Sequence, residues 1–124
     1  MGRVVHFEIT ADDPKRAAKF YSELFDWKMN DSGMPNMDYT LVTTGDEKDM
    51  GIDGAIMPRT YRQQPVINTI AVDDLKDILE KVKAAGGESV GDVQDIPGIG
   101  KFSYIKDTEG NLVGLLQPLP RQGK

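Results

Sequence analysis

Residues 4–14 read Val-Val-His-Phe-Glu-Ile-Thr-Ala-Asp-Asp-Pro, and residues 66–75 read Val-Ile-Asn-Thr-Ile-Ala-Val-Asp-Asp-Leu. Each stretch is rich in β-branched residues and has two aspartates just before its last residue. The second pair of aspartates follows the first by 61 positions. A strand leading into a helix fits both, because Asp13 and Asp74 suit N-caps and Pro14 suits the first helical position. The two stretches therefore predict an internal duplication.

The segments that follow the two aspartate pairs have the spacing of amphipathic helices. Apolar residues recur there at intervals of three and four, which places them on one helical face; they are Ala17, Phe20, Tyr21, Leu24 and Phe25, and then Leu75, Ile78, Leu79 and Val82. The second helix is expected to end at Gly86-Gly87, where glycine can adopt the left-handed conformation of a C-cap.

A second anchor for the duplication is the closing strand of each half. Residues 54–58 (Gly-Ala-Ile-Met-Pro) match residues 114–118 (Gly-Leu-Leu-Gln-Pro) 60 positions later. Further strands are expected at 28–30 and 39–43 in the first half and at 89–94 and 101–106 in the second, with a hairpin turn at 107–111. The sequence thus predicts an α+β fold of two βαβββ modules, residues 1–60 and 61–124, joined through the polar stretch 59–65.

Composition excludes several classes of function. The chain has 124 residues, 39% of them hydrophobic and 28% charged, which is typical of one soluble globular domain. Its net charge of −5 argues against nucleic-acid binding. Without cysteine it has no disulfide, thiolate nucleophile or iron–sulfur cluster. No apolar run is long enough to cross a bilayer and no signal segment is seen, so we expect a cytoplasmic protein.

The paired modules resemble the vicinal oxygen chelate superfamily, which includes glyoxalase I, bleomycin-resistance proteins and extradiol dioxygenases. The resemblance covers nearly the whole chain and rests on His6, Phe20-Tyr21, Val72-Asp73-Asp74, Ala85-Gly86-Gly87, Asp107-Thr108-Glu109-Gly110, Gly54–Pro58 and the stretch 95–100. It implies two curved mixed sheets around a concave pocket, in the glyoxalase-like fold. Function has to be argued from the site itself.

The resemblance also implies where metal ligands should stand, on the first and last strands of each module. Here those positions are His6 and Ile67 on the first strands and Gly54 and Gly114 on the last strands. Only Glu8 adds a carboxylate on the face of His6, because side chains alternate along a strand; Asp53 is expected to face the other way. A catalytic zinc site needs about three protein ligands. We therefore expect no cofactor, although His6 and Glu8 would be the ligands of any divalent metal.

The candidate site residues follow from strand position. His6 and Glu8 are the candidate catalytic residues, as ligands or as an acid–base pair, although a hydrogen-bonded strand histidine and a solvated Glu8 explain them equally well. The expected pocket residues are His6, Glu8, Tyr39, Gly54, Ile67, Thr69, Phe102, Tyr104 and Gly114. Each of the aromatic residues could instead belong to the core.

Three functions remain open at this stage. The first is a metal-independent protein that binds a small organic molecule in the sheet pocket, to sequester it or to sense it. The second is a metal-dependent lyase of the glyoxalase type that uses His6 and Glu8. The third is a structural or interaction module whose pocket has closed. Dioxygenase chemistry is not expected, because the family's iron site uses two histidines and the chain has one. A homodimer is expected, with no nucleic-acid or membrane partner.

Overall fold

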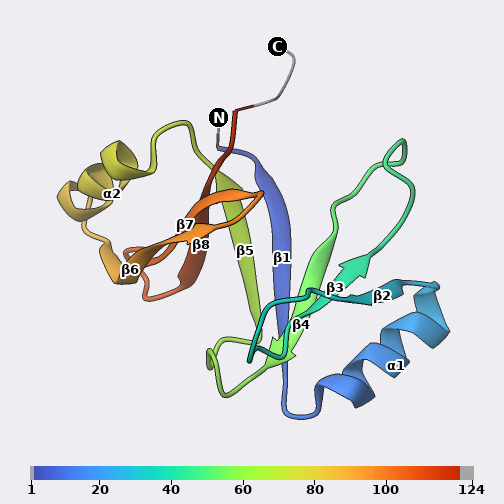
Figure 1. Ribbon diagram of the computed structural model, residues 1–124. Coiled ribbons are helices and arrows are strands. Elements are labelled where there is room, and N and C mark those ends of the chain that lie inside the picture. Colours follow the sequence, from blue (N-terminus) through green and yellow to red (C-terminus); the bar gives the residue numbers. More distant parts are fainter. Residues whose placement is uncertain (1, 121–124) are drawn as a thin grey trace. The chain divides into compact units, whose positions relative to one another are not determined.

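The computed structural model describes residues 2–120 and contains the predicted element order twice (Figure 1). Each half runs strand, helix and three strands. The elements are β1 (Val4–Ala11), α1 (Pro14–Phe25), β2 (Lys28–Asp31), β3 (Thr40–Thr43), β4 (Gly54–Pro58), β5 (Val66–Ala71), α2 (Leu75–Ala84), β6 (Glu88–Ile96), β7 (Gly100–Lys106) and β8 (Leu112–Pro118). The predicted α+β class and the βαβββ duplication are confirmed.

The chain forms two compact units, which are described separately. The first unit comprises residues 5–67, and the second comprises residues 68–120 together with the first few residues of the chain. Those N-terminal residues belong to the second unit because the Gly2 amide donates to the Ala71 carbonyl and the Ala71 amide donates to Arg3 (2.8 and 2.9 Å). The predicted division between residues 60 and 61 concerns the repeat in the sequence and stays a prediction.

In the first unit the strands lie in the order β2-β3-β4-β1, with β1 and β4 parallel and the other pairs antiparallel. The helix α1 packs on β2 and β4 (Figure 1). Its Ala17, Ala18 and Tyr21 contact a buried cluster of Ala11, Val42 and Ile56. Small residues on the helix let it approach the sheet closely. They also leave the larger Phe20, Leu24 and Phe25 more than half exposed, so the predicted apolar face is only partly buried.

In the second unit the strands lie in the order β5-β8-β7-β6. As in the first unit, the first and last strands of the repeat, β5 and β8, are parallel, and the other pairs are antiparallel. The helix α2 packs on β6, β7 and β8. Leu75, at its first position, is 1% exposed and joins Val72, Ile105 and Leu115 in the core of this unit. Here the predicted apolar helical face is used as expected.

The helix ends follow the sequence signals. Asp13 and Asp74 are N-caps, and their carboxylates accept hydrogen bonds from the amides of Arg16 and Asp77 at 3.1 Å each. The helix α2 ends just before Gly86, whose positive φ of 99° terminates it as predicted. Neither helix is long and apolar enough to cross a membrane, within the part of the chain that is described.

The strand β6 is longer than predicted, and it contains an irregularity. Its pairing with β7 shifts register between Val90 and Gln94, and Gly91 lies there with a φ of 76°. A bulge of this kind adds residues to a strand without ending it. The hairpin turn before β8 forms as predicted, because Asp107 accepts hydrogen bonds from the amides of Glu109 and Asn111.

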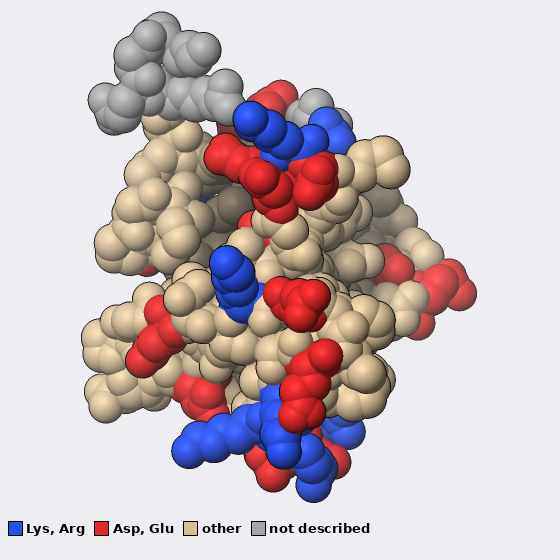
Figure 2. Space-filling model, turned by 90° about the vertical axis from the view of Figure 1, so that its right-hand side faces the viewer, with Lys and Arg blue, Asp and Glu red and all other residues tan. Residues whose placement is uncertain are grey.

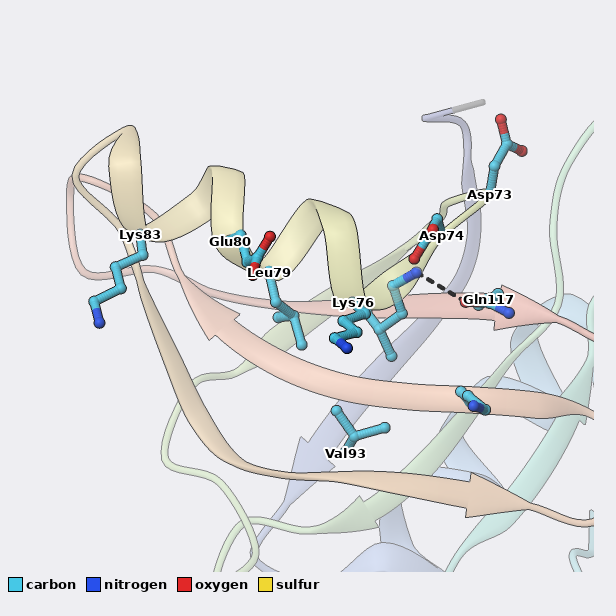
Figure 3. A pocket seen from close by; sticks show the side chains of 10 residues that line it. Asp73, Asp74, Lys76, Leu79, Glu80, Lys83, Val93 and Gln117 are labelled. Carbon is cyan, nitrogen blue, oxygen red and sulfur yellow. Dashed lines mark hydrogen bonds between the residues drawn. The ribbon is translucent and has the colours of Figure 1, made fainter.

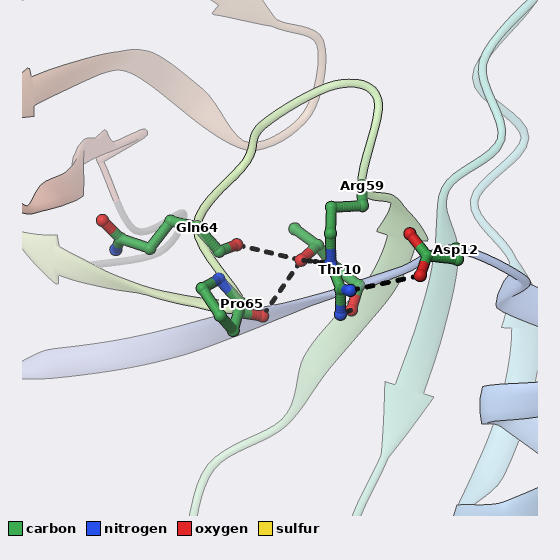
Figure 4. A network of polar contacts seen from close by, with 5 residues as sticks. All are labelled: Thr10, Asp12, Arg59, Gln64 and Pro65. Carbon is green, nitrogen blue, oxygen red and sulfur yellow. Dashed lines mark hydrogen bonds and ion pairs between the residues drawn. The ribbon is translucent and has the colours of Figure 1, made fainter.

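The end of β1 is tied to the stretch 59–65 by a polar network around Thr10 (Figure 4). The Thr10 hydroxyl donates to the carbonyls of Gln64 and Pro65 (2.9 and 3.2 Å) and accepts from Arg59 Nε (3.2 Å). Arg59 also donates to Asp12 at 3.3 Å. Thr10 is 2% exposed, so these bonds compensate the burial of its hydroxyl, and they give the network a structural role.

Candidate functional site

A hydrogen-bonded bridge joins the two candidate catalytic residues of the first unit. The Tyr39 hydroxyl donates to Glu8 Oε2 at 2.7 Å and lies 2.9 Å from His6 Nε2. Because a phenol carries one proton and gives it to the carboxylate, His6 must donate its Nε2–H to Tyr39. In the neutral ring the lone pair then lies on Nδ1. His6, Glu8 and Tyr39, all predicted as site residues, are thus brought together.

Strand register explains how Tyr39 reaches β1 from two strands away. Leu41, Ala55 and Glu8 form one row across β3, β4 and β1. Side chains two residues apart on a strand share a face, so Tyr39 points to the same side as Glu8. Ala55 lies between them and carries only a methyl group, which leaves room for the phenol to cross β4. Tyr39 was predicted to line the pocket, but no pattern in the sequence indicated this bridge.

Burial controls the protonation of the site. Desolvation lowers the pKa of His6 below its ordinary value of 6.5, and the negative charges of Glu8 and Asp53 oppose that effect. Glu8 is only 4% exposed. A buried carboxylate of this kind is costly unless it is hydrogen-bonded, and Tyr39 supplies such a bond. The alternative explanation, a Glu8 side chain that faces water, does not hold in this structure.

Gly54 does not belong to this face, which corrects the expected pocket. It pairs with Phe7, and a Cβ at Gly54 would meet the backbone oxygen and ring of Phe7. Extending the same register by one residue places Asp53 beside His6, in agreement with its electrostatic effect on that ring. The expectation that Asp53 points away from His6 was wrong because it relied on the 60-residue alignment of the closing strands. Asp53 also accepts a 2.8 Å bond from the Thr44 amide.

In the second unit the predicted residues do share one face. Thr69 pairs with Gly114, and Gly114 pairs with Tyr104. A Cβ at Gly114 would lie 2.7 Å from the Phe102 ring and 2.8 Å from the Thr69 hydroxyl. The Phe102 and Tyr104 rings meet edge to face at 4.8 Å. Ile67, the last residue of the first unit, precedes Thr69 by two positions on β5 and is fully buried.

The Thr69 side chain is the unusual group of this second set. It is 2% exposed, and its hydroxyl has no hydrogen-bond partner among the described residues. Buried hydroxyls are normally paired, because desolvation without a compensating bond costs about 1–3 kcal/mol. This buried hydroxyl lies close to the Phe102 ring, on the face that carries Gly114.

The residues of the first unit fit a divalent metal poorly. Among residues 2–120 no three His, Asp or Glu side chains are placed to hold one together. The two atoms predicted as metal ligands, His6 Nε2 and Glu8 Oε2, both contact the Tyr39 hydroxyl. A metal needs the lone pair of that nitrogen, whereas the bridge needs its proton. Metal binding at this position therefore requires Tyr39 to leave.

A separate cleft of about 680 Å³ lies in the second unit between α2 and the strands β6 and β7 (Figure 3). Sequence reasoning did not anticipate it, and none of the predicted site residues lines it. Its walls combine Leu79 and Val93 with three lysines, which are Lys76, Lys83 and Lys101. They also carry three carboxylates, those of Asp73, Asp74 and Glu80. Gln117, at one end, accepts a 2.8 Å bond from the Leu75 amide. Because three positive and three negative side chains line this cleft, its charge favours neither anionic nor cationic ligands.

Comparison with known proteins places this chain in a family. Residues 3–115 match the family model described as Glyoxalase/Bleomycin resistance protein/Dioxygenase superfamily. The chain belongs to this superfamily, which confirms the resemblance inferred from its sequence.

Two relatives agree with that assignment. A "Glyoxylase-like domain-containing protein" of Didymella fabae is 35% identical over 118 residues, which cover 89% of each chain. The "Putative glyoxylase CFP32" of Mycobacterium tuberculosis is 33% identical over 113 residues, which cover 89% of this chain and 43% of that protein. The chain therefore spans less than half the length of the mycobacterial relative.

Solved structures share the fold at low sequence identity. Methylmalonyl-CoA epimerase from Mycobacterium tuberculosis superimposes with a TM-score of 0.71 at 14% identity, covering 94% of this chain and 88% of that one. The match confirms the glyoxalase-like fold.

Proposed function

We propose that this protein binds a small organic molecule at the His6–Tyr39–Glu8 bridge without a catalytic metal. The observation that carries the proposal is the place of the Tyr39 hydroxyl, 2.9 Å from His6 Nε2 and 2.7 Å from Glu8 Oε2. The two groups that would hold a metal are already joined by a third side chain. The ligand would meet His6 through Nδ1, which accepts a hydrogen bond when the ring is neutral.

Thr69 supports ligand binding in the second unit. Its buried hydroxyl has no partner among the described residues, and it lies beside the Phe102 ring. A ligand with a carbonyl or hydroxyl group would supply the missing hydrogen bond, and an apolar part would pack on the aromatic pair. Ligands of this kind combine polar and apolar parts, as do the bleomycin of the family description and the acyl thioester of the structural neighbour.

A fragment screen tests the proposal without knowledge of the natural ligand. Small polar aromatic compounds, bleomycin and methylmalonyl-CoA are added to the protein, and the imidazole proton signals of His6 are followed by NMR. We expect binders that shift these signals, with affinity at least tenfold weaker in Tyr39→Phe. The matched control is Tyr61→Phe, which removes another phenol of the first unit, one that accepts a bond from the Asp38 amide. Binders whose affinity is unchanged in Tyr39→Phe, or a screen in which no compound shifts the His6 signals, would contradict the proposal.

The second candidate is a metal-dependent lyase in which His6 and Glu8 are ligands. The specific observation in its favour is a buried carboxylate next to an imidazole, in a chain whose relatives carry the name glyoxylase. The same NMR signals separate the two candidates. Adding Zn²⁺ or Ni²⁺ alone should leave the His6 signals in place under the first proposal. Saturable loss or shift of these signals, abolished in Glu8→Ala, would favour the lyase.

A further inference from the structure

The outer face of α1 carries large apolar side chains that the rest of the described chain leaves more than half exposed. Phe20 is 55% exposed, Leu24 is 60% exposed and Phe25 is 56% exposed. Phe20 and Leu24 lie one turn apart on a single ridge, with Arg16 one turn before them. In α2 the residue that begins the helix is buried and joins the core. Exposed clusters of this kind mark sites of association more often than isolated apolar residues do.

Apart from the N-cap carboxylate of Asp13, charges on α1 run against the direction that stabilises an isolated helix. The first turn has no acidic residue and the last turn has no basic one, while Lys15 and Arg16 stand at the N-terminal end and Glu23 and Asp26 at the C-terminal end. The helix macrodipole favours the opposite order, with acidic residues near the N-terminus and basic residues near the C-terminus. The other helix obeys the rule, with Asp77 in its first turn and Lys81 and Lys83 in its last.

An antiparallel copy of the same helix would turn this reversed order into an attraction. A two-fold axis beside Phe20 places Arg16 of one copy against Glu23 of the other, and repeats that pair by symmetry. Phe20 would then pack on its equivalent, and the Leu24 side chains of the two copies would lie on either side of that contact. Figure 2 looks at the side of the molecule that carries α1 in Figure 1, and shows small separate groups of basic and acidic side chains with uncharged surface between them.

We infer that the exposed face of α1, formed by Arg16, Phe20, Glu23 and Leu24, binds the same face of a second copy of this chain in antiparallel orientation. Charge complementarity favours a second copy as the partner, because the same helix carries both Arg16 and Glu23, the two residues that would pair. The inference is independent of the ligand site: it uses no residue of the His6–Tyr39–Glu8 bridge, so either proposal can fail alone.

Sedimentation velocity over a range of protein concentrations tests the inference. The wild-type chain should form a dimer, and Phe20→Glu should weaken it by at least tenfold in dissociation constant. The matched control is Ile99→Glu, since Ile99 is 50% exposed but lies outside α1. A chain that stays monomeric, or a dimer that Phe20→Glu leaves intact, would overturn the inference. A monomer that instead co-sediments with anionic phospholipid vesicles would assign the face to a membrane and overturn it as well.

Charge exchange tests the antiparallel orientation. Arg16→Glu and Glu23→Arg should each weaken the dimer, because each creates two like-charge pairs, and the double exchange should restore it. Glu23→Arg breaks the ion pair of Glu23 with Lys19 (3.8 Å), so its monomer should melt at a slightly lower temperature. Arg16→Glu corrects the charge order of the helix, so its monomer should melt at an equal or higher temperature. This gain separates lost association from damaged folding. Failure of the double exchange to restore the dimer would contradict the antiparallel arrangement.

Discussion

The two units share one order of elements but surround equivalent polar groups differently. Glu8 and Thr69 stand 61 positions apart, both nearly fully buried on a first strand. Glu8 accepts a hydrogen bond from Tyr39, whereas Thr69 has no partner among the described residues. Strand pairing explains the difference. Extending the β3–β4 register places Tyr39 opposite Met57, and Phe102 holds the corresponding place opposite Leu116. One unit therefore has a phenol where the other has only a phenyl ring.

This comparison shows what the duplication determines. The repeat supplies strands, helices and the positions that face one another across the sheet. Single substitutions at those positions, Tyr39 for Phe102 and Glu8 for Thr69, then give the first unit a titratable site and leave the second without one. The chemistry of the site thus lies in the differences between the halves.

The largest effect is expected from the closing-strand glycines. Gly54→Ala should lower the free energy of unfolding by about 2–3 kcal/mol, because its Cβ meets the backbone of Phe7. Gly114→Ala should cost about 1 kcal/mol, because its Cβ meets the side chains of Phe102 and Thr69, which can move. Urea unfolding measures both. Equal losses of stability in the two variants would mean that Gly54 on β4 and Gly114 on β8 do not differ in register as described.

Removing the bridging hydroxyl should give the next largest effect. Tyr39→Phe should destabilise the protein by about 1–2 kcal/mol, because the buried Glu8 carboxylate loses a donor. Thr69→Val removes a hydroxyl that has no described partner, so it should change stability by less than about 0.5 kcal/mol or raise it. A loss on Thr69→Val as large as that on Tyr39→Phe would show that the Thr69 hydroxyl is satisfied in solution.

A smaller effect should come from giving the second unit the missing phenol. Phe102→Tyr places a hydroxyl near that of Thr69, and a new hydrogen bond is worth about 0.5–1.5 kcal/mol. A double-mutant cycle with Thr69→Val measures the coupling between the two positions. We expect favourable coupling. A coupling of zero would mean that Phe102 is not placed as Tyr39 is.

The pH dependence of stability should show the smallest effect. Burial lowers the pKa of His6 in the folded protein below 6.5. The unfolded chain then takes up a proton as the pH falls through 6.5, while the folded chain resists until its lower pKa is reached, so stability present above 6.5 is lost in this window. Between about pH 7.5 and pH 5 the wild type should lose more stability than His6→Gln. A smaller loss in the wild type would mean that the pKa of His6 is raised.

Much of the fold could be predicted because its signals are local. The Asp13 and Asp74 caps, the helix-ending Gly86 and the two closing strands each depend on neighbouring residues in the sequence. The face of Gly54 could not be predicted, because it depends on the pairing of β4 with β1. In the sequence the last strands of the two halves align at an offset of 60. In the structure, the equivalent residues Ile9 and Ile70 of the first strands pair with Ile56 and Leu115. Ile56 and Leu115 are therefore equivalent, and the offset between the last strands is 59.

The same limit applied to the site. His6 and Glu8 were predicted from alternation along one strand, which is a local property. The bridge through Tyr39 joins residues 31 and 33 positions apart, and it depends on a small residue, Ala55, in the strand between them. Asp53 was assigned to the wrong face for the same reason as Gly54. Exposure of Phe20 and Leu24 also escaped prediction, because helical spacing does not tell how much of an apolar face the sheet covers.

The central claim is that Tyr39, and no metal, joins His6 to Glu8. Elemental analysis of protein purified without chelators, and dialysed against Ni²⁺, Zn²⁺, Mn²⁺ and Fe²⁺ in turn, tests it most directly. The wild type should retain far less than one equivalent of any of these metals, and Tyr39→Phe should retain more than the wild type because the hydroxyl no longer competes. One equivalent of metal held by the wild type and lost in His6→Ala would contradict the account.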